Sequence, residues 1–257
     1  MTALVNLPPG YRLRTFDTLD STNEEAKRQA QQGAEAGLVL WAKSQSLGRG
    51  RRGRTWISPE GGLYFSLLLK PDCSPERAAQ LSFMSALAVA EGVAPILPGG
   101  REMSFKWPND LLVGGRKVSG ILLDSSGGAA AVEWLVVGIG INVDSHPDGT
   151  DYPATSLSSE GAAGVRHADL LGRIIAAFDR WLKIWEREGF DPVREAWLRG
   201  ARGLGEAISV RLSDRTLEGV FRGLAPDGAL ILEVPGEGER IIPAGDVYFL
   251  ANRWKAS

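Results

Sequence analysis

The sequence is poor in the residues that build metal centres and redox sites. It contains one cysteine, Cys73, and two histidines among 257 residues. A single cysteine excludes an intrachain disulfide and a zinc site made of cysteines alone, and it suits a reducing compartment. Two histidines without supporting ligands are too few for a metal centre or a Ser-His-Asp triad, so His146 and His167 receive no catalytic role. We expect no protein-bound metal.

Two common nucleotide-binding motifs are also missing. No G-x-x-x-x-G-K-[ST] sequence occurs, which excludes a P-loop. Gly138-Ile139-Gly140 ends an apolar strand, but the third glycine of the dinucleotide fingerprint is absent. Residues 144–151, with Pro147 and Gly149, predict a loop where that fingerprint needs a helix. Any ATP site must therefore be of another type, and the two glycines are interpreted as positions where backbone approaches a ligand closely.

A long uninterrupted apolar run and a strong net charge are absent as well. The most apolar stretch, 129–143, contains Glu133, and the first ten residues lack a basic region followed by an apolar core. The 29 basic and 31 acidic residues leave a net charge of -2, which gives no overall attraction to DNA or to anionic lipid. Because 44% of the residues are hydrophobic and 23% are charged, we expect a folded cytoplasmic protein with no membrane or DNA partner.

Helices and strands are expected to alternate irregularly over the first 203 residues. Ser21 and Thr22, each followed three residues later by glutamate, predict a capping box and a helix that stops at Gly33. Further helices are predicted at 75–93 and 167–188, and strands at 38–42, 63–69, 103–107, 118–123 and 135–143. Gly114-Gly115 predicts the turn of a hairpin formed by 103–107 and 118–123. This mixture predicts an α+β domain whose sheet is largely antiparallel and flanked by helices.

The pattern changes after Gly203, so we expect a main domain at 1–203 and a small β domain at 204–257. Ile208, Val210 and Leu212 alternate with polar residues, and Asp227-Gly228 marks a turn. Strands are predicted at 229–234 and 246–250. About fifty residues in short strands can close into a barrel that depends on the main domain for stability.

An unusually long loop, 45–62, contains a dense basic tract. Four arginines and three glycines occupy the seven positions from Gly48 to Arg54. Such a tract can wrap a phosphate, because its backbone is flexible and guanidinium groups pair with oxyanions. A solvated charge run or an RNA-contacting segment would have the same composition, although the net charge of -2 weakens the nucleic-acid interpretation.

A second basic site is predicted around Lys106-Trp107-Pro108-Asn109-Asp110. Lys117 follows seven residues after Asp110 and is expected back across the hairpin, so that two lysines face one site. A pair of cations suits a substrate whose carboxylate and phosphate must approach each other despite their repulsion. The plainer alternative is a turn made by Asn109 and Asp110, flanked by exposed lysines.

Taken in this order, the motifs resemble the catalytic domain of biotin protein ligases. The pattern of that family runs from Ser-Thr-Asn at a helix start through a Gln and G-R-G-R-x-G-R to a Trp-Ser-Pro-like step, K-W-P-N-D, R-K-x-x-G-I-L and G-x-G-I-N. The corresponding segments here are 21–23, Gln45, 48–54, 56–59, 106–110, 116–122 and 138–142. The resemblance implies a class II synthetase-like catalytic domain with a mixed, largely antiparallel sheet, followed by a small SH3-like β-barrel.

The resemblance also implies roles for individual residues. Biotin would be bound by Ser21, Thr22, Asn23, Gln45, Gly48, Arg49, Gly50, Arg51, Lys117, Gly138 and Gly140. ATP and the adenylate would be bound by Arg49, Arg51, Arg54, Trp56, Lys106, Asn109, Asn142 and Lys117. The residues expected to act in catalysis are Lys117, Arg51 and Lys106.

The implied activity is formation of biotinyl-5'-AMP from biotin and ATP with Mg²⁺, followed by transfer of biotin to a lysine of a biotin carboxyl carrier protein. The family includes monomers and homodimers, and the sequence leaves this choice open. Only twenty residues precede Ser21, so we expect no DNA-binding module and no repressor activity. The loop 144–155, expected over the adenine, contains Tyr152 but no tryptophan, so the residue that stacks on adenine is not assigned.

Two other functions compete with this interpretation. A lipoate or octanoate transferase resembles the same fold, but polar residues such as Asn23 and Gln45 do not suit an alkyl tail. The octanoyl-transfer branch also needs a nucleophilic cysteine, which Cys73 does not obviously provide. A non-enzymatic RNA- or partner-binding protein would use the Gly/Arg tract and the terminal β domain. It would bind nucleic acid in a salt-dependent manner and would not consume ATP.

Overall fold

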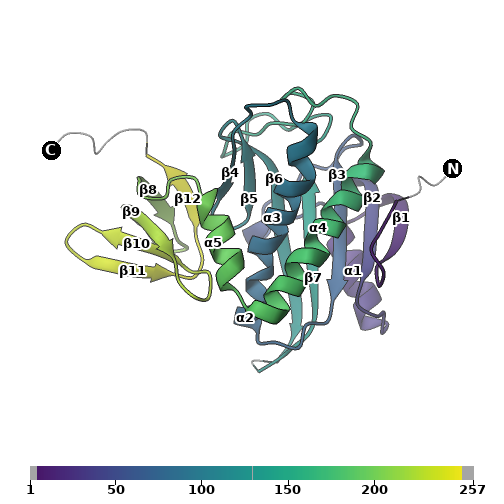
Figure 1. Cartoon of the computed structure of the whole chain (residues 1–257), viewed down its shortest axis with the longest axis horizontal. Coiled ribbons are helices and arrows are strands. Elements are labelled where there is room, and N and C mark those ends of the chain that lie inside the picture. Colours follow the sequence, from purple (N-terminus) through teal and green to yellow (C-terminus); the bar gives the residue numbers. More distant parts are fainter. Residues whose placement is uncertain (1–4, 129, 251–257) are drawn as a thin grey trace.

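A mixed sheet of seven strands forms the centre of the molecule (Figure 1). The computed structural model describes residues 5–128 and 130–250. In spatial order the strands are β1 (Arg12–Leu19), β2 (Leu38–Gln45), β3 (Leu63–Leu69), β7 (Val132–Ile141), β6 (Arg116–Gly127), β5 (Asp110–Val113) and β4 (Met103–Lys106). Only β1 and β2 run parallel, and the other neighbours are antiparallel, as the sequence predicted.

The two faces of the sheet bury different cores, because side chains alternate along each strand. Val137, Ile139 and Ile141 of β7 belong to the larger core, on the face covered by α3 (Leu81–Val93) and α4 (His167–Glu188). Trp134 and Val136 join a smaller core beneath α1 (Thr22–Gln31). Gly138 and Gly140 continue along this second face, where the absence of side chains leaves room for a cavity.

Helix α1 begins where the sequence predicted, but not by the predicted capping box. The Ser21 side chain makes no capping hydrogen bond. Its backbone N–H donates instead to Asp20 Oδ1 (2.8 Å), and Glu24 pairs with Lys27 rather than reaching back to the cap. The polar residues at this helix start therefore remain available to the cavity. The helix ends before Gly33, which has a φ of +85°.

The predicted hairpin at 103–123 is wrong in its pairing. Two turns make three strands: β4 pairs with β5, and β5 pairs with β6. Residues 110–113 form a strand that was not predicted, as was also true of β1. The Gly114-Gly115 turn (φ +55° and +75°) joins this strand, β5, to β6. The consequence for the site is that Asp110 begins a buried strand and is not an ordinary turn residue.

Helix predictions were accurate for α4 and approximate elsewhere. The predicted helix at 75–93 is divided into α2 (Pro75–Ala79) and α3 at Gln80, and α5 (Asp191–Arg199) was not predicted. The segment 75–96 is the one helical stretch, within the described part of the chain, long and apolar enough to cross a membrane. Nearly all side chains of α3 are buried against the sheet and α4, which is the position of a core helix.

The C-terminal residues form a five-stranded antiparallel sheet. Its strands are β8 (Ala207–Arg211), β9 (Thr216–Leu224), β10 (Leu230–Val234), β11 (Gly238–Ile242) and β12 (Asp246–Phe249), in the order β11-β10-β9-β8-β12. Strands β9 and β11 were not predicted. No pairing of β11 with β12 closes a barrel within residues 5–128 and 130–250.

The C-terminal sheet packs directly on the main body (Figure 1). The larger core continues into it through Phe221 and Leu232. Trp107 Nε1 donates to Gly228 O (3.1 Å), and Gln80 Nε2 donates to Pro226 O (3.2 Å). The proposed domain boundary at Gly203 lies in the connection between α5 and β8. The two parts therefore share buried apolar surface and hydrogen bonds, and they place residues of both around one site.

Trp197 offers a test of the packing within the main body. It is fully buried, in edge contact with Phe83 (5.3 Å between ring centroids) and stacked on Phe105 (5.7 Å). We expect Trp197→Ala to lower the free energy of unfolding by about 3–5 kcal/mol, because it leaves a large cavity where β4, α3 and α5 meet. Chemical denaturation would measure this loss. Ile241→Ala, at a position 66% exposed, should change it by less than about 0.5 kcal/mol, and equal effects in the two variants would contradict the packing described.

Candidate active site

A cavity of about 370 Å³ lies on the α1 face of the sheet. Helix α1 and β7 form one end, the Gly/Arg tract 48–54 covers it, and β12 of the C-terminal sheet borders the other end. Of the residues predicted to bind ligands, those that line it are Ser21, Thr22, Asn23, Gln45, Arg49, Gly50, Arg51, Arg54, Trp56, Lys106, Asn109, Lys117, Gly138, Gly140 and Asn142. Gly48 is outside the lining and packs beneath Trp56 and Ser58.

The end nearest α1 is polar and carries little charge. The backbone N–H and hydroxyl of Thr22 lie 2.8 and 3.1 Å from Gln45 Oε1, and Gln45 Nε2 donates to Ser58 Oγ (2.9 Å). Ser66 Oγ lies 2.6 Å from Asn23 Oδ1, an atom that can only accept, so its proton is directed there. The acceptor oxygens of both amides are thus occupied within the protein.

Asp124 fixes the orientation of the Asn23 amide. Asn23 Nδ2 donates to Asp124 Oδ2 (2.7 Å), while the amide oxygen accepts from Ser66. A carboxylate accepts only, so it prevents the amide from turning over. Each of Asn23 and Gln45 keeps one further N–H, and a ligand here must therefore offer an acceptor such as a carbonyl oxygen. Ser66 and Asp124 were not predicted, because they lie on strands far from α1 in sequence.

The two glycines of β7 make room for neighbouring side chains. A Cβ at Gly138 would overlap the Asn23 carboxamide, and a Cβ at Gly140 would lie 2.5 Å from Trp56 Nε1. Real carbon atoms do not approach so closely, so any larger residue would displace Asn23 or Trp56. The structure shows close packing of these two side chains on the glycines, and the predicted approach of the backbone to a ligand stays a prediction.

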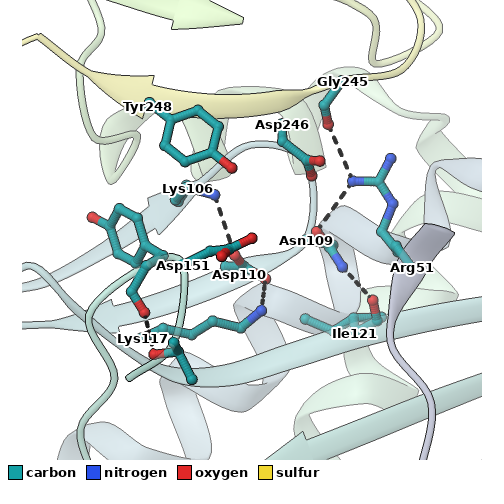
Figure 2. A network of polar contacts seen from close by, with 12 residues as sticks. Arg51, Lys106, Asn109, Asp110, Lys117, Ile121, Asp151, Gly245, Asp246 and Tyr248 are labelled. Carbon is teal, nitrogen blue, oxygen red and sulfur yellow. Dashed lines mark hydrogen bonds and ion pairs between the residues drawn. The ribbon is translucent and has the colours of Figure 1, made fainter. Parts of the chain in front are cut away.

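The other end of the cavity is organised around Asp110, which two lysines share (Figure 2). Lys117 Nζ lies 2.6 Å from Asp110 Oδ1, and Lys106 Nζ lies 3.4 Å from Asp110 Oδ2. Burial raises the pKa of Asp110, but the two lysines lower it by more, so that its pKa lies below the usual range. The carboxylate stays ionised and leaves one net positive charge on the trio.

Lys106 is the more deeply buried of the two cations. Burial lowers its pKa and the cation Lys117 adds to this effect, although Asp110 opposes both. Its ammonium lies 4.9 Å from the Tyr152 ring centroid and 6.0 Å from that of Tyr248. The aromatic faces partly replace water around this charge. The sequence argument, that two lysines face one site, is confirmed.

The four arginines of the tract point to different partners. Arg49 pairs with Glu24 of α1 (2.8 Å). Arg51 points inward and donates to Asn109 Oδ1 (3.4 Å) and Gly245 O (3.5 Å), as Figure 2 shows. Arg52 and Arg54 pair with Asp246 of β12, at 3.3 and 2.7 Å. Arg49, Arg51 and Arg54 line the cavity, and Arg51 is half-buried whereas the other arginines of the tract are exposed. Burial lowers the pKa of Arg51, and nearby Asp246 and Asp110 oppose this effect.

The loop after β7 closes the remaining side of the cavity. Lys117 N–H donates to Pro153 O (2.8 Å), and Thr155 N–H donates to Lys117 O (2.9 Å). The Tyr152 hydroxyl donates to Gly115 O (3.0 Å). The backbone of this loop therefore pairs with the strand that carries Lys117. Asp246 and Tyr248 were not predicted as site residues, because they lie on the C-terminal sheet, far in sequence from the other lining residues.

No metal site is built into the described residues 5–128 and 130–250. They contain no group of three or more His, Cys, Asp or Glu side chains that could hold a metal ion. The two most buried carboxylates of the cavity, Asp110 and Asp246, already pair with two cations each. These side chains do not fit a resident Mg²⁺ ion, which needs free carboxylate oxygens.

Comparison with known proteins gives two family matches. Residues 15–142 match the biotin/lipoate A/B protein ligase family, and residues 203–250 match the biotin protein ligase C-terminal domain. A biotin–[acetyl-CoA-carboxylase] ligase from Paracoccus denitrificans is 40% identical over 235 residues, which cover 90% of this chain and 97% of that protein. The bifunctional ligase/repressor BirA from Bacillus subtilis is 34% identical over 93% of this chain and 74% of its own length.

A solved structure shares the whole arrangement. The biotin protein ligase from Aquifex aeolicus, in complex with biotin and ATP, is 31% identical and superposes with a TM-score of 0.79. The match covers 92% of this chain and 97% of that protein. Both sheets therefore have counterparts in a protein of known structure.

Asp110 provides the test of the site's electrostatics. Asp110→Asn leaves two buried lysines without a counter-charge, so we expect it to lower the free energy of unfolding at pH 7 by about 3–5 kcal/mol. Because the pKa of Asp110 is lower in the folded than in the unfolded chain, its stabilisation is present above the unfolded value and is lost as the pH falls through the folded value. Denaturation should show a shallower loss of stability below about pH 4 in the variant.

The matched control is Asp214→Asn, at an exposed carboxylate of the C-terminal sheet. It should leave both the stability at pH 7 and the acid slope unchanged. Wild-type stability and wild-type pH dependence in Asp110→Asn would show that the shared carboxylate does not hold the two lysines.

Proposed function

The chain belongs to the biotin protein ligase family, and from this premise we propose how its cavity performs the reaction. It joins biotin to ATP as biotinyl-5'-AMP and then transfers biotin to a lysine of a biotin carboxyl carrier protein. The observation that carries the proposal is the asymmetry of the cavity: a neutral polar end at Asn23 and Gln45, and a cationic end at Lys117 and Arg51. This matches a substrate with an uncharged polar ring at one end and a carboxylate at the other.

The neutral end suits the ureido group of biotin. The free N–H groups of Asn23 and Gln45 are donors for its carbonyl oxygen, and the hydroxyls of Ser21 and Thr22 are acceptors for its N–H groups. Orienting these groups through Ser66 and Asp124 lowers the cost of ordering them when the ligand binds. A lipoyl or octanoyl tail would leave the same buried groups unpaired, which disfavours it strongly. We therefore assign biotin rather than lipoate as the substrate.

The cationic end suits the reacting groups. A biotin carboxylate oxygen attacks the α-phosphorus of ATP, a P–O bond forms, and the bond to pyrophosphate breaks. Lys117 and Arg51 reduce the repulsion between carboxylate and phosphate and stabilise the charge that builds on the phosphoryl oxygens. Lys106, held near them by Asp110, adds a fixed positive field. Trp56 lies over Lys117 at 5.2 Å and shields this centre from water.

Mg²⁺ enters with ATP in this proposal, as part of the metal–nucleotide substrate. The protein's contribution is then electrostatic and is made by Arg49, Arg51, Arg54, Lys106 and Lys117. Asn109 and Asn142 fix the backbone around the site: Asn109 donates to Ile121 O, and Asn142 donates to Thr155 O. We place the reaction in the cytoplasm, where ATP is available and the lone Cys73 stays reduced.

Substitutions of Lys117 and of Arg51 are expected to impair different steps of the reaction. Lys117→Met removes a cation from the reacting phosphate, and we expect adenylate formation to slow by about 10²-fold or more, as for other preorganised charge donors. Arg51→Gly opens the cover of the cavity, so the adenylate should form and then escape. Rapid-quench analysis of bound and released adenylate separates these defects. Arg215→Gly, at an exposed arginine outside the cavity, should change neither the rate of adenylate formation nor the retention of the adenylate. Wild-type adenylate formation in Lys117→Met and wild-type adenylate retention in Arg51→Gly would contradict the assigned roles.

Exchange of labelled pyrophosphate into ATP tests the proposed activity as a whole. With Mg²⁺ and biotin, we expect exchange that octanoate and lipoate do not support, because adenylation is reversible and only biotin satisfies the neutral end. Exchange with a fatty acid alone would assign the protein to lipoate chemistry. No exchange with any of the three acids would exclude a ligase mechanism.

A further inference from the structure

A second cavity, of about 310 Å³, adjoins the first. Ala79 and Phe83 of the α2–α3 segment line it together with the Asp227–Ala229 turn of the C-terminal sheet. Trp107 and Pro108 also line it, and most of its surface is apolar. The function proposed above leaves this cavity without a role.

The two cavities meet at the cationic end of the first. Arg51, Asn109, Ile121 and Leu122 line both of them. The hydrogen bond from Arg51 Nη1 to Asn109 Oδ1, at 3.4 Å, crosses this junction, and Asn109 is held in turn by Ile121 O. The long Arg51 bond can open with a small side-chain movement, since 3.4 Å is beyond the usual range for N–H to O bonds.

The charged residues that line the second cavity are acidic where they are exposed to solvent and basic at the junction with the first cavity. Glu76 and Asp227, both exposed, line the second cavity on the solvent side. Asp227 Oδ1 accepts from Ala229 N–H (2.9 Å), and a hydrogen bond from Ser74 lowers the pKa of Glu76. Arg51 is the one cation among the lining residues and lies at the inner end.

We propose that the second cavity is the channel through which the carrier's lysine reaches the acyl adenylate. This inference rests on the proposed function, in which biotin and the adenylate fill the first cavity. A lysine side chain has a four-carbon stem that suits apolar walls and an ammonium that suits an acidic rim. Arg51 and Asn109 then form the gate between the carrier's side and the adenylate's side.

The same arrangement prepares the amine for reaction. An ammonium that leaves the acidic rim and enters an apolar cavity toward Arg51 loses hydration and meets a like charge, and both effects lower its pKa. Its proton leaves through the mouth to solvent. The neutral nitrogen then attacks the carbonyl carbon, the N–C bond forms, and the bond from that carbon to the AMP oxygen breaks. A second proton leaves the nitrogen as the amide forms.

Transfer and adenylation can be measured separately, which makes the proposal testable. Ala79→Trp narrows the second cavity, and the double variant Glu76→Gln/Asp227→Asn neutralises its rim. None of these residues lines the first cavity. Matched controls are Ala163→Trp and Glu239→Gln/Asp214→Asn, at exposed positions outside both cavities. Each protein is loaded with biotin and ATP and then mixed with the biotin-acceptor domain of a carboxylase, or with hydroxylamine, a small neutral nucleophile.

Biotin-dependent pyrophosphate exchange should stay within about twofold of wild type in all variants. Ala79→Trp should slow transfer to the acceptor domain by about tenfold or more, because displaced nucleophiles react far more slowly. The double rim variant should raise the half-saturating concentration of acceptor about threefold to tenfold at low salt, a difference that high salt removes. Its reaction with hydroxylamine should be unchanged.

Transfer to the acceptor domain at control rates in both Ala79→Trp and the rim variant would overturn the proposed channel. That result leaves the ligase function intact, since exchange continues. Absence of biotin-dependent exchange in the wild-type protein would instead remove the proposed function and the channel with it.

Discussion

The site depends on one buried carboxylate shared by two ammonium groups. Two lysines within reach of the same cavity would repel each other, and each would lose hydration on burial. Asp110 makes the arrangement possible because it starts strand β5 between them and is nearly inaccessible to solvent. The trio keeps a net positive charge, which a carboxylate and a phosphate can then share. The cationic end is therefore fixed before any ligand binds.

The rest of the architecture places the neutral polar end of the cavity, at Asn23 and Gln45, opposite this cationic end. Alternation along β7 directs Val137, Ile139 and Ile141 to one face and leaves Gly138 and Gly140 on the other, beneath Asn23 and Trp56. The Gly/Arg tract covers the gap, and Asp246 of the C-terminal sheet holds two of its arginines. Arg51 is thereby left to face the cavity. Both sheets thus contribute to one electrostatic gradient, from neutral at α1 to cationic at β5.

Local sequence signals predicted the elements whose causes are local. The amphipathic periodicity of 167–188 and the apolar run of 63–69 predicted α4 and β3 accurately. All the residues that the family resemblance implied as ligand-binding, except Gly48, also line the cavity. What sequence could not show depends on pairing between distant segments: Asp124 orienting Asn23, Asp246 holding the arginine tract, and β5 inserted between β4 and β6. The capping box failed because Ser21 N–H donates to the neighbouring Asp20, and Glu24 pairs with Lys27 and with the distant Arg49.

The most direct test of this account is a crystal structure with biotinyl-5'-AMP or a non-hydrolysable analogue bound. The account predicts the ureido carbonyl oxygen at the N–H groups of Asn23 and Gln45, and the acyl phosphate within hydrogen-bonding distance of Lys117 Nζ and the Arg51 guanidinium. Lys106 should remain on Asp110. A phosphate bound away from Lys117, or a ureido ring bound at the Tyr152 end of the cavity, would contradict the assignment of a neutral end and a cationic end.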